Sequence, residues 1–230
     1  MEPGGRRPAP QSLRPLQEFM NTYNMEREHL GLPKDEFGSP GALHRWLADQ
    51  GLLRGNVRVR EPDRRRALDV RAALRRLALA HNGMPADPAD VTILDRLARQ
   101  ARLVIRFQRD GTMRLEPVMA GALGALGRLL AAALTAQIDG TWARLKACRR
   151  CHWAFYDHSK NRSGRWCVMS ICGNRVKAQN YRVHHRGLRR RRASSRLPAS
   201  RSARAHGRSR GRSVRRPARA PAAAPLRSGR

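Results

Sequence analysis

The chain contains four cysteines, and all of them lie in one short window. They form two close pairs, Cys148 with Cys151 and Cys167 with Cys172, separated by residues 152–166. Two local pairs of thiolates, each on its own turn, are the ligands of a closed tetrahedral zinc site. Two disulfides are the alternative, but the N-terminus shows no apolar segment of a secretion signal, and a reducing compartment favours metal. We therefore expect these four cysteines to bind one Zn²⁺ per chain.

The chain is strongly basic, with 48 lysines and arginines, 17 aspartates and glutamates and a formal net charge of +31. Residues 1–142 carry +6, residues 143–186 carry +10, and residues 187–230 carry +15 without an acidic side chain. Charge polarised in this way is typical of proteins that bind a polyanion, most often nucleic acid. The most apolar stretch, residues 129–134, is too short to cross a bilayer. We therefore expect no membrane partner and a cytoplasmic protein.

Regular spacing of apolar residues predicts helices at about 12–25, 40–50 and 63–82, and a further helix that begins at Asp87-Pro88. Ser39-Pro40 supplies the cap and the first-turn proline of the second helix. Strands at 103–107 and 112–115 flank Asp110-Gly111 and predict a hairpin. The following segment, rich in Gly and Ala, predicts a long helix that faces the core with Met119, Leu123, Leu126, Leu130, Leu134 and Ile138.

These patterns predict four regions. Residues 12–142 are expected to form a mostly helical domain with a core of its own, and residues 143–186 a small zinc finger. Residues 1–11 and 187–230 are rich in Pro, Gly, Arg and Ala and are expected to be disordered. The fold class is therefore α+β, with a predominantly helical N-terminal domain that contains one β-hairpin. A treble-clef-like finger and a disordered basic tail follow this domain.

Within the finger, we expect a turn at the first cysteine pair, an aromatic strand after it, and a returning strand at Arg165–Cys167. A helix then begins at Cys172-Gly173, so that its first turn carries the last ligand. Gly173 is expected to adopt a positive φ that aims backbone amides at the thiolate. Because so small a module buries little apolar surface, aromatic side chains are expected to cover the metal, namely Trp153, Phe155 and Trp166.

The segment F-Y-D-H-S-K-N-R-S-G-R-W-C-V-M-S-I-C-G-N-R-V-K-A closely resembles the CGNR zinc finger, which is named after the residues found here at 172–175. The resemblance covers residues 144–186. The preceding region resembles the N-terminal domain that accompanies this finger, described as a putative stress-induced transcription regulator. This second resemblance rests on F-M-N-T-Y-N, W-L-A-D-Q-G-L-L and D-G-T-W-A-R-L-K-A-C. Together they imply DNA binding and control of transcription.

The basic side chains of the finger are the candidate nucleic-acid contacts. At the start of the last helix, Asn174 or Arg175 could read bases, and the others would contact phosphates. The complete set of candidates is Arg149, Arg150, Lys160, Arg162, Arg165, Asn174, Arg175, Lys177, Arg182 and Arg186. DNA is favoured over RNA, although Tyr156 and Tyr181 could stack on unpaired bases.

Other functions stay open at this stage. The finger could dock a protein, or only brace the domain, while the N-terminal domain binds a small-molecule effector that no motif identifies. No phosphate-binding loop, HExxH motif or nucleophile elbow is present, so we do not expect an enzyme. The tail is either an electrostatic arm for nucleic acid or a GC-rich extension without function. The sequence does not indicate an oligomeric state.

Overall fold

The computed structural model describes residues 5–24, 34–55 and 57–194, with side chains up to residue 188. Residues up to Arg186 form one compact unit, and a second unit begins at Gly187. The first unit contains five helices among its described residues before the cysteines. They are α1 (Arg14–Asn21), α2 (Pro40–Asp49), α3 (Glu61–Ala80), α4 (Pro88–Ala101) and α5 (Gly121–Ile138). The elements after α5 are the strands β3 (Leu145–Ala147) and β4 (Ala154–Tyr156) and the helix α6 (Asn174–Ser194).

The helices begin where the sequence places their caps. The Ser39 hydroxyl accepts a hydrogen bond from the Ala42 N–H at 3.2 Å, directly before Pro40 in the first turn of α2. The Asp87 carboxylate accepts from the Ala89 N–H at 2.9 Å at the start of α4. Such caps satisfy amides that have no partner inside the helix. The predicted helices are therefore confirmed, with bounds shifted by a few residues.

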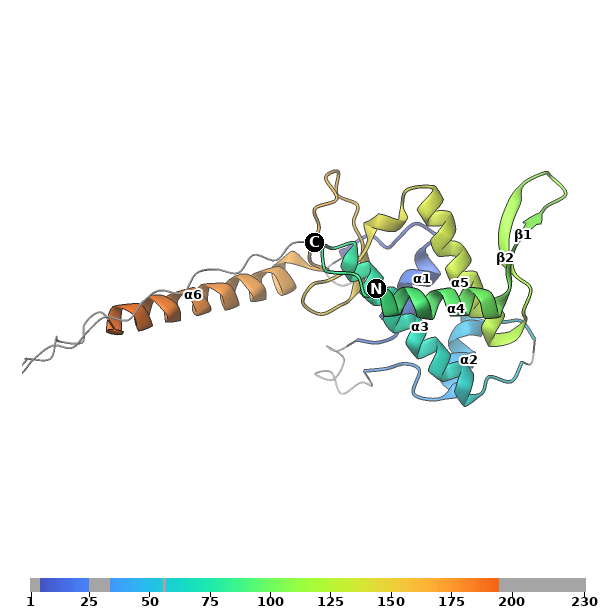
Figure 1. The fold of residues 1–230 in the computed structure, drawn as a ribbon, viewed down its shortest axis with the longest axis horizontal. Helices are drawn as coiled ribbons and strands as arrows, with labels where there is room; N and C mark the ends of the chain where they lie inside the picture. Colours follow the sequence, from blue (N-terminus) through green and yellow to red (C-terminus); the bar gives the residue numbers. More distant parts are fainter. Residues whose placement is uncertain (1–4, 25–33, 56, 195–230) are drawn as a thin grey trace, which may run out of the picture. The chain divides into compact units, whose positions relative to one another are not determined.

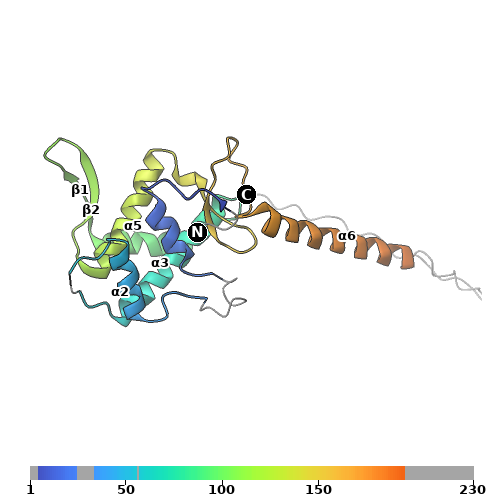
Figure 2. The ribbon, with the colours of Figure 1, turned by 180° about the vertical axis from the view of Figure 1, so that it is seen from behind.

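Helix α5 contacts α1, α2, α3 and α4, and the other central helix of the body is α3, which also contacts α1, α2 and α4. Helix α4 lies in front of α3 in Figure 1, and α1 and α2 lie in front of it in the opposite view of Figure 2. Three aromatic rings join α1 to α2 and the segment before it. Phe19 lies 5.5 Å from Trp46 and 5.8 Å from Phe37, measured between ring centroids. Phe19 and Phe37 are fully buried, so this cluster anchors the N-terminal half of the core.

The same core includes side chains from the cysteine region. Leu145, Ala147, Ala154 and Tyr156 are buried in one cluster with the helices, where β3 packs on α3 and β4 packs on α1. The expectation that residues 12–142 hold a separate core is therefore wrong. The predicted boundary at residue 142 lies inside one compact unit, because the antiparallel pair β3–β4 completes the helical core.

The predicted disorder at the two ends is also corrected for the residues that the structure describes. Ala9 is buried, and its N–H donates to the Gln17 side chain at 2.7 Å. The Arg6 guanidinium donates to the Tyr156 carbonyl at 3.2 Å. These contacts hold the segment from residue 5 onward against the body. At the other end, residues 187–194 continue α6, whereas residues 1–4 and 195–230 lie outside the described residues.

Helix α5 buries part of the predicted stripe, since Leu126 is fully buried and Leu123 and Leu130 pack against the core, but its C-terminal end departs from the prediction. Leu134 and Ile138 are 44% and 80% exposed, whereas the small residues Ala122 and Ala125 are buried beside Leu126 and Leu129. The small residues face inward because there is no room for larger ones. A Cβ added at Gly127 would lie 2.9 Å from the Ala101 Cβ and 3.0 Å from the Pro117 Cβ. The small face allows α4 and the hairpin to approach closely. Large apolar residues therefore remain outside at the C-terminal end.

The length of α5 also corrects the sequence argument about membranes. Its 18 residues have a mean hydropathy of 1.4, so the helix is long and apolar enough to span a bilayer by these two measures alone. Core helices of globular proteins meet the same criterion, and 44% of this helix is buried against the rest of the body. Its contacts with α4 and β2 are those of a core helix.

The predicted hairpin is present, with β1 (Leu103–Phe107) paired to β2 (Met113–Pro117) in antiparallel register. It extends away from the helices beyond its base (Figure 1). Ile105 is paired with Leu115, and Phe107 with Met113, so all four lie on one face. At the tip this face is open, with Ile105 64% and Phe107 76% exposed.

The close approach at Gly127 yields a test of the packing. Gly127→Ala should lower the free energy of unfolding by about 1–3 kcal/mol, because neither neighbouring Cβ can move independently of its backbone. Gly41→Ala is the matched control, since a Cβ there meets only ordinary contacts at 3.8 Å or more inside another helix. The control should be neutral or slightly stabilising. Urea unfolding measures both, and equal stability of the two variants would refute the packing argument.

Candidate metal centre

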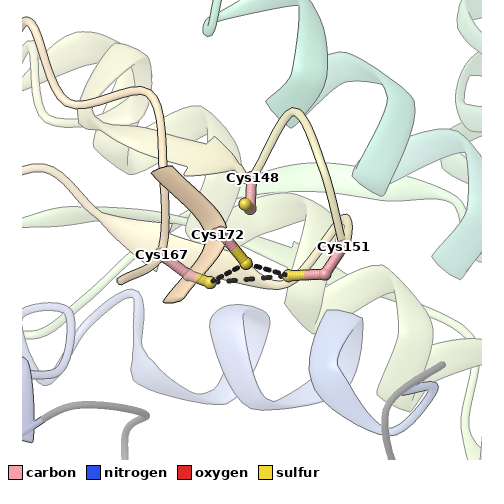
Figure 3. A group of neighbouring side chains, drawn as sticks. All are labelled: Cys148, Cys151, Cys167 and Cys172. Carbon is pink, nitrogen blue, oxygen red and sulfur yellow. Dashed lines mark hydrogen bonds between the residues drawn. The ribbon is translucent and has the colours of Figure 1, made fainter. Parts of the chain in front are cut away.

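The four cysteines converge on one point (Figure 3). Their sulfur atoms all lie within 4.8 Å of one another, and all four residues are buried. The Cys151 sulfur is 3.4 Å from that of Cys167 and 3.7 Å from that of Cys172, and the latter two are 3.6 Å apart. A tetrahedron with Zn–S bonds of about 2.3 Å has S···S edges of roughly 3.8 Å. The donor set and its spacing therefore fit one Zn²⁺.

The electrostatics of the cluster also favour a cation. A hydrogen bond with Cys148 raises the pKa of Cys151 to about 12, and hydrogen bonds with Cys148 and Cys151 raise the pKa of Cys167 above its usual range. Four neighbouring sulfurs do not all ionise unless a positive ion balances them. The Arg150 guanidinium approaches the Cys172 sulfur at 3.9 Å and adds positive charge on one side.

The first cysteine pair lies on the turn that joins β3 to β4. Within this turn, the Cys148 N–H donates to the Trp153 carbonyl at 2.9 Å, and the His152 N–H donates to the Cys148 carbonyl at 2.9 Å. His152 adopts a φ of 60°, which closes the turn. The hairpin of the finger is therefore β3–β4. The returning strand predicted at Arg165–Cys167 is wrong, because this segment forms no strand.

The second pair lies at the entrance to α6. Cys172 occupies a π-helical turn, Met169–Gly173, directly before the helix. Gly173 has no positive φ, and its N–H donates to the Val168 carbonyl at 3.3 Å rather than to sulfur. The expected reason for this glycine is therefore wrong. A Cβ at this position would lie 2.3 Å from the Met169 sulfur and 3.0 Å from Trp166, so a larger residue would displace the Met169 side chain.

Aromatic residues cover the cysteines as expected. Phe155 is fully buried against them, and Trp153 and Trp166 are half-buried in the same cluster. Tyr156 is also buried, at 5% exposure, so it is not available to stack on a base. His152 and His158 are not members of the cysteine cluster, and His158 instead contacts the Pro8 carbonyl at 3.0 Å.

Buried amides of α1 fix the finger hairpin to the body. The Asn21 side chain accepts from the Ala154 N–H at 2.8 Å and donates to the Ala154 carbonyl at 2.9 Å. Gln17 donates to the same carbonyl at 3.2 Å. We call this set of contacts the Ala154 clamp. The only signal of this clamp in the sequence is the pair of amides, Gln17 and Asn21, on an otherwise apolar helix stripe, and the clamp was not predicted.

Two further side chains, Arg75 on α3 and Asn82 just after its C-terminal end, hold the turn that carries the first cysteine pair. The Arg75 guanidinium donates to the His152 carbonyl at 2.9 Å. Burial lowers the pKa of Arg75 to about 10, so it stays charged at neutral pH. Asn82 donates to the Ala147 carbonyl at 2.8 Å and to the Arg165 carbonyl at 2.9 Å. Backbone on both sides of the cysteine turn is therefore bonded to the helical body.

A buried ion pair organises the loop between the cysteine pairs. The Lys146 ammonium lies 2.8 Å from an Asp157 carboxylate oxygen, and both side chains are almost inaccessible. Burial opposes ionisation of Asp157, but hydrogen bonds from Lys146, Ser159 and Gly164 outweigh it and lower its pKa to about 2. A Cβ at Gly164 would lie 2.9 Å from this carboxylate. Asp157 therefore remains ionised at physiological pH, and removal of Lys146 would leave its carboxylate buried without its partner.

The structure separates the predicted nucleic-acid contacts into two groups. Arg149 donates to the Asn82 carbonyl at 2.6 Å and Arg150 lies at the metal site, and both are half-buried. These two arginines hold the finger through contacts within the protein, and their contact with nucleic acid stays a prediction. The other candidates are exposed: Lys160, Arg162, Arg165, Asn174, Arg175, Lys177, Arg182 and Arg186.

Comparison with known families agrees with this arrangement. The sequence model of the ABATE family, described as putative stress-induced transcription regulator, matches residues 13–154. The chain belongs to the ABATE family. A second model, the CGNR zinc finger, matches residues 144–185 and includes all four cysteines. No curated protein matches the chain. The ABATE and CGNR matches overlap at 144–154, a segment that contributes Leu145, Ala147 and Ala154 to the common core.

Metal analysis tests the centre. The purified, reduced chain should contain one zinc ion, and Cys172→Ser should lose it together with helical signal, because the finger has little other core. His158→Gln is the control and should retain one zinc. Elemental analysis gives the stoichiometry and circular dichroism the helix content. A zinc content near zero in the unmodified chain would contradict the assignment.

Proposed function

We propose that this ABATE protein binds DNA through its CGNR finger and regulates transcription, with α6 as the recognition element. The observation that carries the proposal is the exposure of α6 directly after the last cysteine. Among residues 174–186, Val176 is half-buried and all other side chains are exposed. The segment contains four basic residues and no acidic residue. A helix that presents charge in this way suits a groove lined by phosphates.

The spacing of the charges supports contact along one face. Arg175, Arg182 and Arg186 are separated by seven and four residues, which places them on one side of a helix. The metal cluster fixes the N-terminal end of α6, because Cys172 lies two residues before the helix begins. Asn174 and Arg175 at this end are the candidates for base contacts, and the later arginines suit phosphates.

Duplex DNA is favoured over RNA by the shape of this surface. A single α-helix fits the major groove of B-DNA, whereas the major groove of A-form RNA is too narrow and deep. Single-stranded RNA is usually bound by exposed aromatic platforms. Tyr156 is buried, so Tyr181, which is 66% exposed, remains as a stacking residue on the described part of α6. In this proposal the protein has no catalytic role and acts in the cytoplasm at the nucleoid.

Salt-dependent binding tests the proposal. Arg182→Gln should weaken binding to every duplex and reduce the slope of log affinity against log salt by about 1, as loss of one phosphate contact does. Arg109→Gln removes the same charge from an exposed turn of the β1–β2 hairpin and should leave the slope unchanged. Fluorescence anisotropy with a labelled duplex measures both variants.

Specificity is tested with the same protein. Selection from a random duplex library should enrich a sequence, and single-stranded RNA should bind more weakly than the duplex at equal salt. The proposal fails if no sequence is enriched and dextran sulfate binds as tightly as DNA. Preference for single-stranded RNA would instead support the RNA alternative.

A further inference from the structure

A pocket of about 630 Å³ lies where α1 meets the finger. Its walls include Arg6 and Arg14, Glu18 on α1, Glu36, and the two tryptophans Trp46 and Trp153. The volume is in the range of sites for small organic ligands. The pocket is therefore lined both by the helical body and by Trp153, which lies two residues after Cys151.

Arg6 gives this pocket a fixed positive charge. Its guanidinium lies 4.4 Å from the centre of the Phe155 ring and donates to the Tyr156 carbonyl at 3.2 Å. Within the described residues it has no carboxylate partner. Arg14 differs, because it pairs with Glu18 at 2.8 Å. A half-buried guanidinium with most of its donors unused suits a carboxylate, which it binds through two parallel hydrogen bonds.

The other residues that line the pocket indicate the shape and charge that the rest of the ligand should have. Trp46 and Trp153 are both half-buried, and indole surfaces in a pocket favour a flat or apolar body. Glu36 lines the same pocket and disfavours a ligand with a second negative charge. Gln17 and Asn21 also line it, but their amides hold the Ala154 clamp and are engaged with the backbone.

We propose that this pocket binds a small aromatic monocarboxylate, with its carboxylate on Arg6 and its ring against the tryptophans. The proposal does not depend on DNA binding. Because Trp153 packs on the cysteines and Arg6 lies on the Phe155 ring, the bound ligand would rest directly on the aromatic cover of the metal cluster.

Titration of the full, zinc-loaded chain with phenylacetate tests the proposal. Two of the four tryptophans line the pocket, so saturable binding should change tryptophan emission. Phenylacetamide has the same ring without the charge and should bind at least about tenfold more weakly. Phenylmalonate adds a second charge and should also bind more weakly. Calorimetry provides an independent affinity for each probe.

Variants locate the site. Arg6→Gln should weaken phenylacetate binding about tenfold or more, and Arg6→Lys should restore part of it. Arg7→Gln is the matched control, because Arg7 is exposed and does not line the pocket. Zinc content and melting temperature show whether each variant is folded. The proposal is overturned if phenylacetate does not bind saturably, if the amide binds equally well, or if Arg6→Gln and Arg7→Gln behave alike. The amide comparison uses the unmodified chain, so it holds even if Arg6→Gln fails to fold.

Discussion

The Ala154 clamp is the interaction on which the rest of the structure depends. Asn21 satisfies both the N–H and the carbonyl of one residue in β4, and Gln17 adds a second donor to the same carbonyl. All of these groups are buried, and a buried amide that loses its partner is costly. Opposite the clamp, Arg75 and Asn82 bond the backbone around the cysteine turn. The metal-bearing hairpin is therefore part of the helical body and not a module tethered to it.

This arrangement explains how so short a segment holds both the metal site and the exposed start of α6. The cysteine cluster has one fully buried large side chain of its own, Phe155, and two half-buried tryptophans. Apolar burial in a cluster of this size does not supply enough free energy for folding. Metal binding and contacts with the helical body supply the rest. The ion pair between Lys146 and Asp157 then fixes the loop that leads to the second cysteine pair. Helix α6 begins directly after this part of the fold, so the position of its first exposed residues is fixed by the cysteine cluster.

Local features were predictable from the sequence, and long-range ones were not. Ser39 and Asp87 gave the starts of α2 and α4 because a cap depends only on its neighbours. The spacing of the cysteines gave the metal ligands for the same reason. The shared core was missed because Asn21 and Ala154 are 133 residues apart, and no local pattern joins them. The reason expected for Gly173 was wrong because it depends on which side chains lie nearby in space, here Met169 and Trp166.

The central claim is that the zinc site and the helical body form one cooperative unit. Thermal unfolding of the full chain, followed by circular dichroism with and without a zinc chelator, tests it most directly. The account predicts that chelation lowers the melting temperature of the α1–α5 helical signal, and that body and finger unfold in a single transition. An unchanged melting temperature for most of the helical signal, with only α6 and the finger lost on chelation, would contradict the shared core.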